Sequence, residues 1–165
     1  MLMDNLLKAR EEILTSVQGL TDDQLNETVM EGSWSVAQVL EHLYLMEENV
    51  VRQIQFALQQ EKFKAPEAFL VHLVADRTKK VSAPEFLTPS NEFLTLENLK
   101  GKLGSSRRAL EKIIEETNEE ELNQKTLEHR RFGVLTLKQW IELVGYHEQR
   151  HLGQIEELKE KLVNN

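Results

Sequence analysis

Four amphipathic segments of helical period constrain the fold of this chain more than any other sequence feature. Apolar residues recur every three or four positions within residues 4–20, 36–58, 96–117 and 137–162, with charged residues between them. This spacing places the apolar side chains on one face of a helix. No stretch shows the sustained alternation of a strand, and no Gly-rich phosphate loop or internal repeat is present. The pattern therefore predicts an all-α four-helix bundle, because each helix must bury its one apolar face.

Three capping boxes of the form S/T-x-x-Q mark the expected helix starts, at Thr21, Ser35 and Thr136. In such a box the hydroxyl and the Gln side chain each bond a backbone N–H group that the first helical turn leaves unpaired. Trp34 and Leu135 precede the last two boxes and are expected to pack on the first turn as hydrophobic staples. These signals predict a short helical turn after Thr21 and sharp starts for the second and fourth long helices.

The connection between the second and third segments, residues 61–94, is the longest in the chain and contains all three prolines, Pro66, Pro84 and Pro89. Proline interrupts a helix, so only a short helical piece is expected here, around residues 67–75. A connection of this length is unusual in a compact domain and needs a structural reason. A crossover along the bundle supplies one, and it predicts the order up-down-down-up, with helices two and three parallel.

Length and charge restrict the class of protein. The 165 residues, 19.2 kDa, fit one domain over residues 1–165. Lys and Arg number 20 against 28 Asp and Glu, a net charge of −8, which opposes binding to nucleic acid or to anionic membranes. No run of about 18 apolar residues and no leader pattern is seen. We therefore expect no membrane association and a cytoplasmic location.

Two histidines interrupt the apolar stripe of the fourth segment. The stripe runs Ile141, Val144, His147, His151 and Ile155, so the two rings stand one turn apart on the face where Leu or Ile is expected. Burying two imidazoles costs free energy unless their nitrogens find partners, and a transition metal satisfies one nitrogen of each. Chance core or surface histidines remain the alternative for the pair taken alone.

A third histidine, His42, lies in the apolar stripe of the second segment. If the second and fourth helices face each other, His42 approaches His147 and His151 and completes a set of three nitrogen ligands. The chain has no cysteine, so any metal must be held by His, Asp or Glu. Three neutral imidazoles leave positions for water or substrate, as in catalytic sites. Zn²⁺ fits this set best, with Ni²⁺, Co²⁺ and Fe²⁺ as alternatives.

Residues 147–151 also match H-E-x-x-H, the zinc-protease motif in which the glutamate is the general base. That function needs a further ligand, usually downstream, yet no histidine follows His151 and no strand is expected to edge a cleft. Glu148 lies about 100° round the helix from His147. We expect it to be a solvated or interfacial carboxylate, with a role beside a ligand or as a proton shuttle near metal-bound water as the alternative.

Three stretches together resemble a known family. These are WSVAQVLEHL at residues 34–43, FGVLTLKQW at 132–140 and HEQRH at 147–151. In this order, and over nearly the whole chain, they resemble the DinB-like superfamily of metal-binding four-helix bundles. The resemblance implies a divalent metal, often nickel or zinc, on His42, His147 and His151. It also implies the long crossover and a homodimer.

The resemblance implies a range of activities. Better-understood members are S-transferases and isomerases that use low-molecular-weight thiols, and others are inferred to be hydrolases. We therefore expect a metal-dependent enzyme that activates a thiol or water for a small-molecule substrate, with a non-catalytic, dimeric metal- or ligand-binding module as the alternative. Many members have His-Pro before the fourth helix where this chain has His129-Arg130, so no role is carried onto His129. His129 and His72 are expected to be ordinary loop histidines.

Overall fold

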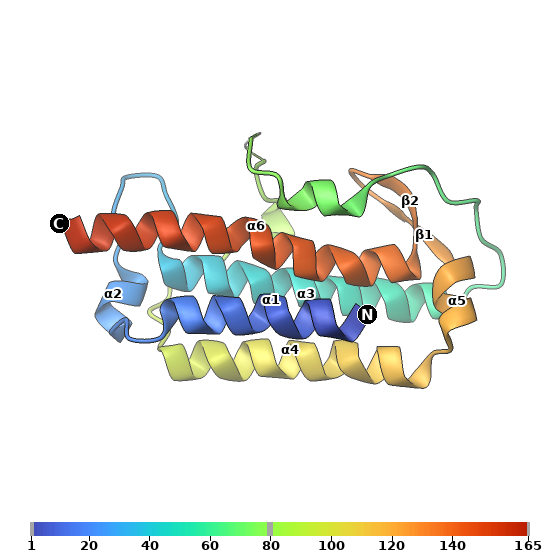
Figure 1. The fold of residues 1–165 in the computed structure, drawn as a ribbon, viewed down its shortest axis with the longest axis horizontal. Helices are drawn as coiled ribbons and strands as arrows, with labels where there is room; N and C mark the ends of the chain where they lie inside the picture. The colour runs from blue at the N-terminus through green and yellow to red at the C-terminus, as the bar shows by residue number, and fades with distance from the viewer. Residues whose placement is uncertain (1, 79–80, 165) are drawn as a thin grey trace.

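Four long helices lie side by side and form the body of the molecule (Figure 1). The computed structural model describes residues 2–78 and 81–164. The long helices are α1 (Leu2–Val17), α3 (Val36–Leu58), α4 (Leu96–Glu116) and α6 (Leu137–Asn164). The predicted four-helix bundle is confirmed. None of the described helices has both the length and the apolar composition of a membrane span.

Two apolar clusters fill the bundle and establish the helix directions. One cluster joins the end of α1 and of α6 to the starts of α3 and α4, through residues such as Val17, Val39, Leu103 and Ile155. The other joins the opposite ends of the same four helices. Helices α3 and α4 therefore run in one direction and α1 and α6 in the other, the order up-down-down-up that Figure 1 shows.

The predicted capping boxes form at the helix starts. The Ser35 hydroxyl accepts from the backbone N–H of Gln38 at 3.2 Å, and the Gln38 amide oxygen accepts from the Ser35 N–H at 2.9 Å. Thr136 and Gln139 make the same pair of bonds before α6. The box at Thr21 begins the short helix α2 (Asp22–Asn26). Local sequence thus fixes where the two histidine-bearing helices begin, and with it the height of each histidine in the bundle.

The crossover follows the outside of the bundle and contains two short 3₁₀ helices, η1 (Val71–Ala75) and η2 (Glu85–Leu87). The expected helical piece over residues 67–75 is therefore the 3₁₀ helix η1. Helix η1 packs against α6, and η2 packs against α3. The crossover consequently covers the side of the bundle on which α3 and α6 meet.

The segment between α4 and α6 is more ordered than expected. It contains the helix α5 (Glu119–Gln124) and an antiparallel hairpin of β1 (Thr126–His129) and β2 (Gly133–Thr136). The expectation that no strand forms is wrong. Each strand has only four residues, which is too short for alternation to be visible in the sequence. Gly133, with φ of +79°, supplies the left-handed conformation that the hairpin turn needs.

Candidate metal centre

The three predicted histidines meet between α3 and α6. His42 lies in the second turn of α3, and His147 and His151 lie one turn apart in the middle of α6. The Nε2 atom of His147 is 3.0 Å from that of His42 and 3.1 Å from that of His151. The ring centroids are 4.5 to 4.8 Å apart. The structure therefore brings the side chains of two distant segments to one point.

Hydrogen bonds at the outer nitrogens set the direction of two of the rings. His42 Nδ1 lies 2.7 Å from the carbonyl oxygen of Leu87, and His151 Nδ1 lies 2.7 Å from the side-chain oxygen of Gln154. Both oxygens only accept, so each Nδ1 carries the proton and donates. In a neutral ring this leaves the lone pair on Nε2, which faces the other histidines. The indole of Trp34 packs on His42 at 4.9 Å between ring centroids.

The protein alone does not supply a hydrogen-bond donor for every Nε2 lone pair of the three histidines. His42 and His151 both present Nε2 lone pairs, and a neutral His147 has at most one Nε2 proton to share between them. At least one lone pair is left facing another nitrogen at hydrogen-bond distance. A cation at the shared point satisfies all three. The chemistry of the donors thus fits a divalent metal.

The spacing of the nitrogens fits the same conclusion. Ligands about 2.0–2.1 Å from a zinc ion stand about 3.4 Å apart at the tetrahedral angle and about 2.9 Å apart at a right angle. The two Nε2 separations measured here, 3.0 and 3.1 Å, fall between these values. Among the described residues, His42, His147 and His151 form the one cluster of potential metal ligands, and together they suggest a divalent metal.

The environment keeps the three imidazoles neutral, as metal ligands must be. Burial lowers the pKa of His42, although its bond to Leu87 acts in the opposite direction. Burial also lowers the pKa of His147 far below 6.5, with further contributions from the neighbouring rings and from Arg150. The pKa of His151 falls to about 3 through burial and the charge of His42. Metal therefore does not compete with a proton at these nitrogens near neutral pH.

The site is not fully closed to solvent. His42 is 3% exposed, whereas His147 and His151, both on α6, are partly exposed. Solvent therefore reaches the site along α6, and we call this its open side.

A second polar cluster lies within the bundle, and one side chain from each long helix contributes to it. Arg10, Glu47, Arg107 and Glu148 are all at least nine-tenths buried. Glu47 binds Arg10 at 3.0 Å and Arg107 at 2.7 Å, and Glu148 binds the same two arginines at 2.9 and 2.5 Å. Two guanidinium groups and two carboxylates balance in charge, which is the condition for burying them. We call these four residues the buried ion cluster.

Backbone and hydroxyl groups add further hydrogen bonds to the buried ion cluster. Arg10 Nη1 donates to the Leu103 carbonyl oxygen at 2.9 Å, and Ser106 Oγ donates to Glu47 at 2.5 Å. Burial alone would lower the pKa of Arg10, but the charges of Glu148 and Glu47 outweigh it and raise that pKa. For Glu148 burial has the larger effect and raises the pKa of the carboxyl, although the charges of Arg10 and Arg107 act in the opposite direction.

The buried ion cluster corrects the expectation for Glu148. It is 2% exposed and is neither solvated nor at an outer interface. Its Oε1 atom accepts from Arg10 and Arg107, and within the described part of the chain its Oε2 atom has no hydrogen-bond partner. No hydrogen bond joins it to the histidines. The H-E-x-x-H match thus lacks the free carboxylate that a protease would need.

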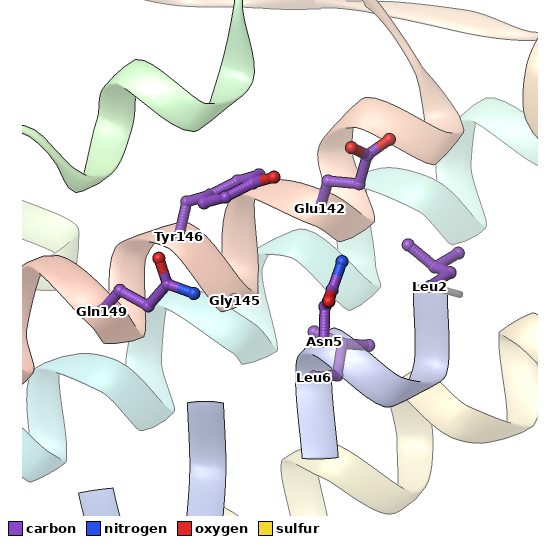
Figure 2. A pocket seen from close by; sticks show the side chains of 7 residues that line it. All are labelled: Leu2, Asn5, Leu6, Glu142, Gly145, Tyr146 and Gln149. Atoms are coloured by element: carbon purple, nitrogen blue, oxygen red, sulfur yellow. The ribbon is translucent and has the colours of Figure 1, made fainter. Parts of the chain in front are cut away.

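A small hollow beside the histidine site lies between α1 and α6 (Figure 2). Tyr146 and Gln149, one residue before and two after His147, line this hollow. The two helices are in contact here, because a Cβ atom at Gly145 would lie 3.8 Å from the side chain of Leu6. Its lining carries no histidine. We therefore assign it to helix packing and place the functional site on the crossover side.

Comparison with known proteins agrees with the geometry. The sequence model of the DinB superfamily matches residues 5–155. The chain belongs to the DinB superfamily. It is 32% identical over 155 residues to the uncharacterised protein YuaE of Bacillus subtilis, a match covering 94% of this chain and 95% of YuaE.

Two further relatives extend the DinB comparison. The chain is 26% identical to "Putative metal-dependent hydrolase OB0413" of Oceanobacillus iheyensis, over 85% of this chain and 73% of that protein. It also resembles the crystal structure of TT2238, described as a four-helix bundle protein, with a TM-score of 0.65 and 20% identity. That match covers 94% of this chain and 96% of TT2238, and it supports the bundle fold alone.

The other two histidines of this DinB-superfamily chain lie outside the ligand set. His72 is exposed on η1. His129, at the end of β1, stacks on Phe132 at 4.6 Å and packs on Trp140 at 4.9 Å. Its Nδ1 atom accepts from the backbone N–H groups of residues 131 and 132. His129 is therefore a packed hairpin residue, more buried than the loop histidine we expected.

The arginines and glutamates of the buried ion cluster were missed by the sequence analysis, although a signal was present. Arg10 follows Leu6 by four residues and precedes Ile13 by three, so it occupies a core position of α1. Glu47 and Arg107 hold equivalent positions in α3 and α4. Oppositely charged residues at core positions of different helices indicate a buried ion network, in the same way that the histidines indicate a metal.

Proposed function

We propose that this protein is a metal-dependent enzyme in which His42, His147 and His151 hold zinc or nickel. The observation that carries the proposal is the convergence of three Nε2 atoms from α3 and α6 at a site with one open side. The OB0413 relative, named for metal-dependent hydrolysis, supports the metal. The open side is where a small-molecule substrate would enter.

A metal bound there would lower the pKa of a coordinated thiol or water and supply thiolate or hydroxide near neutral pH. The chain's own residues prepare the site for it. The Leu87 carbonyl and the Gln154 side chain hold the rings of His42 and His151 in the tautomer that presents Nε2. Burial keeps the rings unprotonated, so the ligands are ready at physiological pH.

Between thiol transfer and hydrolysis, the arrangement of carboxylates favours a thiol. Hydrolysis needs a group that moves protons between water and the leaving group. Glu148 is the carboxylate nearest in sequence to the ligands, but Arg10 and Arg107 hold it. Transfer of a metal-bound thiolate to an electrophile needs no such base. We therefore propose a thiol-dependent S-transferase, with a low-molecular-weight thiol as co-substrate.

Hydrolysis is the second candidate, because OB0413 carries that name. The alternative outside catalysis is a dimeric module that binds metal or a small ligand without turnover. A homodimer and a cytoplasmic location belong to the same proposal.

The activity is tested on protein purified without a histidine tag and loaded with zinc or nickel. We expect loss of free thiol when the protein is mixed with a thiol and an electrophile such as 1-chloro-2,4-dinitrobenzene, and no such loss with His42→Ala. The matched control is His72→Ala, an exposed histidine outside the site. Turnover of esters or amides instead of thiols would identify the hydrolase. Inactivity of fully loaded protein toward both substrate classes would favour the binding module.

A further inference from the structure

Four arginines from three separate segments lie in the region of the histidine site. Arg77 follows η1 in the crossover, Arg130 and Arg131 form the turn of the hairpin, and Arg150 lies on α6 between the two ligand histidines. Figure 1 shows η1 above the first half of α6 and the hairpin above the start of that helix, and η1 and β2 both contact it. We call these four residues the arginine rim.

Contacts place the arginine rim at the site. The guanidinium of Arg130 lies 5.3 Å from the ring centroid of Phe86, an exposed aromatic residue. Phe86 adjoins Leu87, whose carbonyl oxygen orients His42. Arg77 lies against α6 at residue 153, two positions after His151, where a Cβ atom would be 2.6 Å from its Nη1 atom. Its guanidinium therefore lies directly on the ligand helix.

The arginine rim gathers positive charge close to the ligand helix. Arg77 lies against α6 at residue 153, and Arg150 belongs to that helix. The Asp76 carboxylate acts on Arg150 and offsets part of this charge. Such a concentration of positive charge is unusual in a chain of net charge −8.

Carboxylates of the protein neutralise the arginine rim only in part. Arg77 forms a two-pronged ion pair with Glu157 at 2.9 and 3.0 Å, and Arg150 donates to the backbone carbonyl of Asp76. Arg130 and Arg131 are exposed and lie against the rings of Phe86 and Phe132. Among the ion pairs of residues 2–78 and 81–164, none includes Arg130 or Arg131. Two guanidinium groups thus face solvent with their donors available.

We propose that the arginine rim binds a negatively charged group of the substrate, such as a carboxylate, while another part of that substrate reaches the metal. The inference rests on the proposed function, because it assigns the chemistry of the molecule that enters the same site. Guanidinium is suited to this role, since it stays charged and offers two parallel N–H donors to a carboxylate. The hairpin arginines, Arg130 and Arg131, carry most of the selectivity.

The test compares two thiols that differ only in charge, 3-mercaptopropionate and its methyl ester. Each is titrated into Co²⁺-loaded protein, and binding is followed by the thiolate-to-cobalt absorption band. We expect the carboxylate to bind about tenfold more tightly than the ester at low salt. The double variant Arg130→Ala/Arg131→Ala should lose most of this difference. Arg108→Ala, an exposed arginine on α4, is the matched control and should retain it.

Salt supplies a second measurement that needs no variant. High ionic strength should weaken binding of the carboxylate and leave the ester unchanged, because exposed charges are screened. Equal affinity of wild-type protein for the two thiols would overturn the anion site and leave thiol activation standing. Absence of the absorption band with both thiols, in protein that carries cobalt, would overturn the proposed thiol chemistry and this inference with it.

Discussion

The histidine site and the buried ion cluster occupy the same bundle, share helices α3 and α6, and even use adjacent residues, His147 and Glu148. They differ in how their polar atoms are satisfied. In the buried ion cluster, two arginines and two glutamates balance each other and take further bonds from the backbone. In the histidine site, three Nε2 atoms face one another with at most one proton among them.

This difference in the pairing of polar atoms distinguishes a structural polar cluster from a site that binds a ligand. The charges of the buried ion cluster balance within the protein, and its ion pairs join all four long helices, although Arg10 Nε and Glu148 Oε2 have no partner among the described residues. A half-open set of lone pairs, held in place by outer hydrogen bonds, is complete only when a cation joins it. The same contrast explains why Glu148, despite its place in H-E-x-x-H, belongs to the structure and not to the reaction.

The largest effect is expected from breaking the buried ion cluster. Glu47→Ala leaves Arg10 and Arg107 without one of their two carboxylates, and we predict a loss of about 3–5 kcal/mol in the free energy of unfolding. Urea titration followed by circular dichroism measures it. Glu48→Ala is the control: its partly exposed ion pair with Arg52 spans 3.8 Å and is worth at most about 1 kcal/mol. A loss from Glu47→Ala no larger than that of the control would refute a structural role for the cluster.

A smaller effect, on zinc affinity, is expected from removing a hydrogen bond to an Nδ1 atom of the histidine site. Gln154→Ala removes the acceptor that orients His151, and we predict about 10–100-fold weaker zinc binding with little change in the stability of metal-free protein. Competition with a chromogenic chelator measures the affinity. Gln149→Ala, on the same helix but facing the hollow of Figure 2, should bind zinc as the wild type does. Unchanged affinity in Gln154→Ala would show that the ring needs no such support.

The smallest effect is a pH dependence at His129, a packed histidine outside both clusters. Burial, with the charges of Arg131 and Arg130, lowers its pKa from 6.5 to about 4. Between these values the unfolded chain binds a proton that the folded chain does not, so the free energy of unfolding falls as pH falls from 6.5 to 4. His129→Asn should make this fall shallower in urea titrations of metal-free protein. With His72→Asn as the control, an equal slope in wild type and His129→Asn would be evidence against the shift.

The parts of the fold encoded in short stretches were predictable from the sequence. Each expected capping box forms, and the bundle follows from four apolar faces. The convergence of His42 with His147 and His151 was also predictable, because histidines at core positions of two helices have few reasons to be there. The hairpin was not predictable, since its four-residue strands contact α3, α6 and Glu67 of the crossover and show no local pattern of their own.

The orientation of Glu148 and the arginine rim could not be predicted for a different reason. Helical spacing places Glu148 on a face of α6, but only the packed bundle shows that Arg10 and Arg107 occupy that face. The arginine rim joins three segments separated by about 20 to 50 residues, brought together by the crossover and the hairpin turn. Both features depend on tertiary contacts. The spacing of residues within one helix does not predict which residues of other segments lie beside it.

The most direct test of the account is the metal content of wild-type protein and of His42→Ala, both purified without a tag and loaded with zinc under the same conditions. We predict about one zinc ion per wild-type chain, and a variant that keeps its helical circular dichroism but retains little metal after dialysis. His72→Ala should match the wild type. Full zinc retention by folded His42→Ala would contradict a centre shared between α3 and α6.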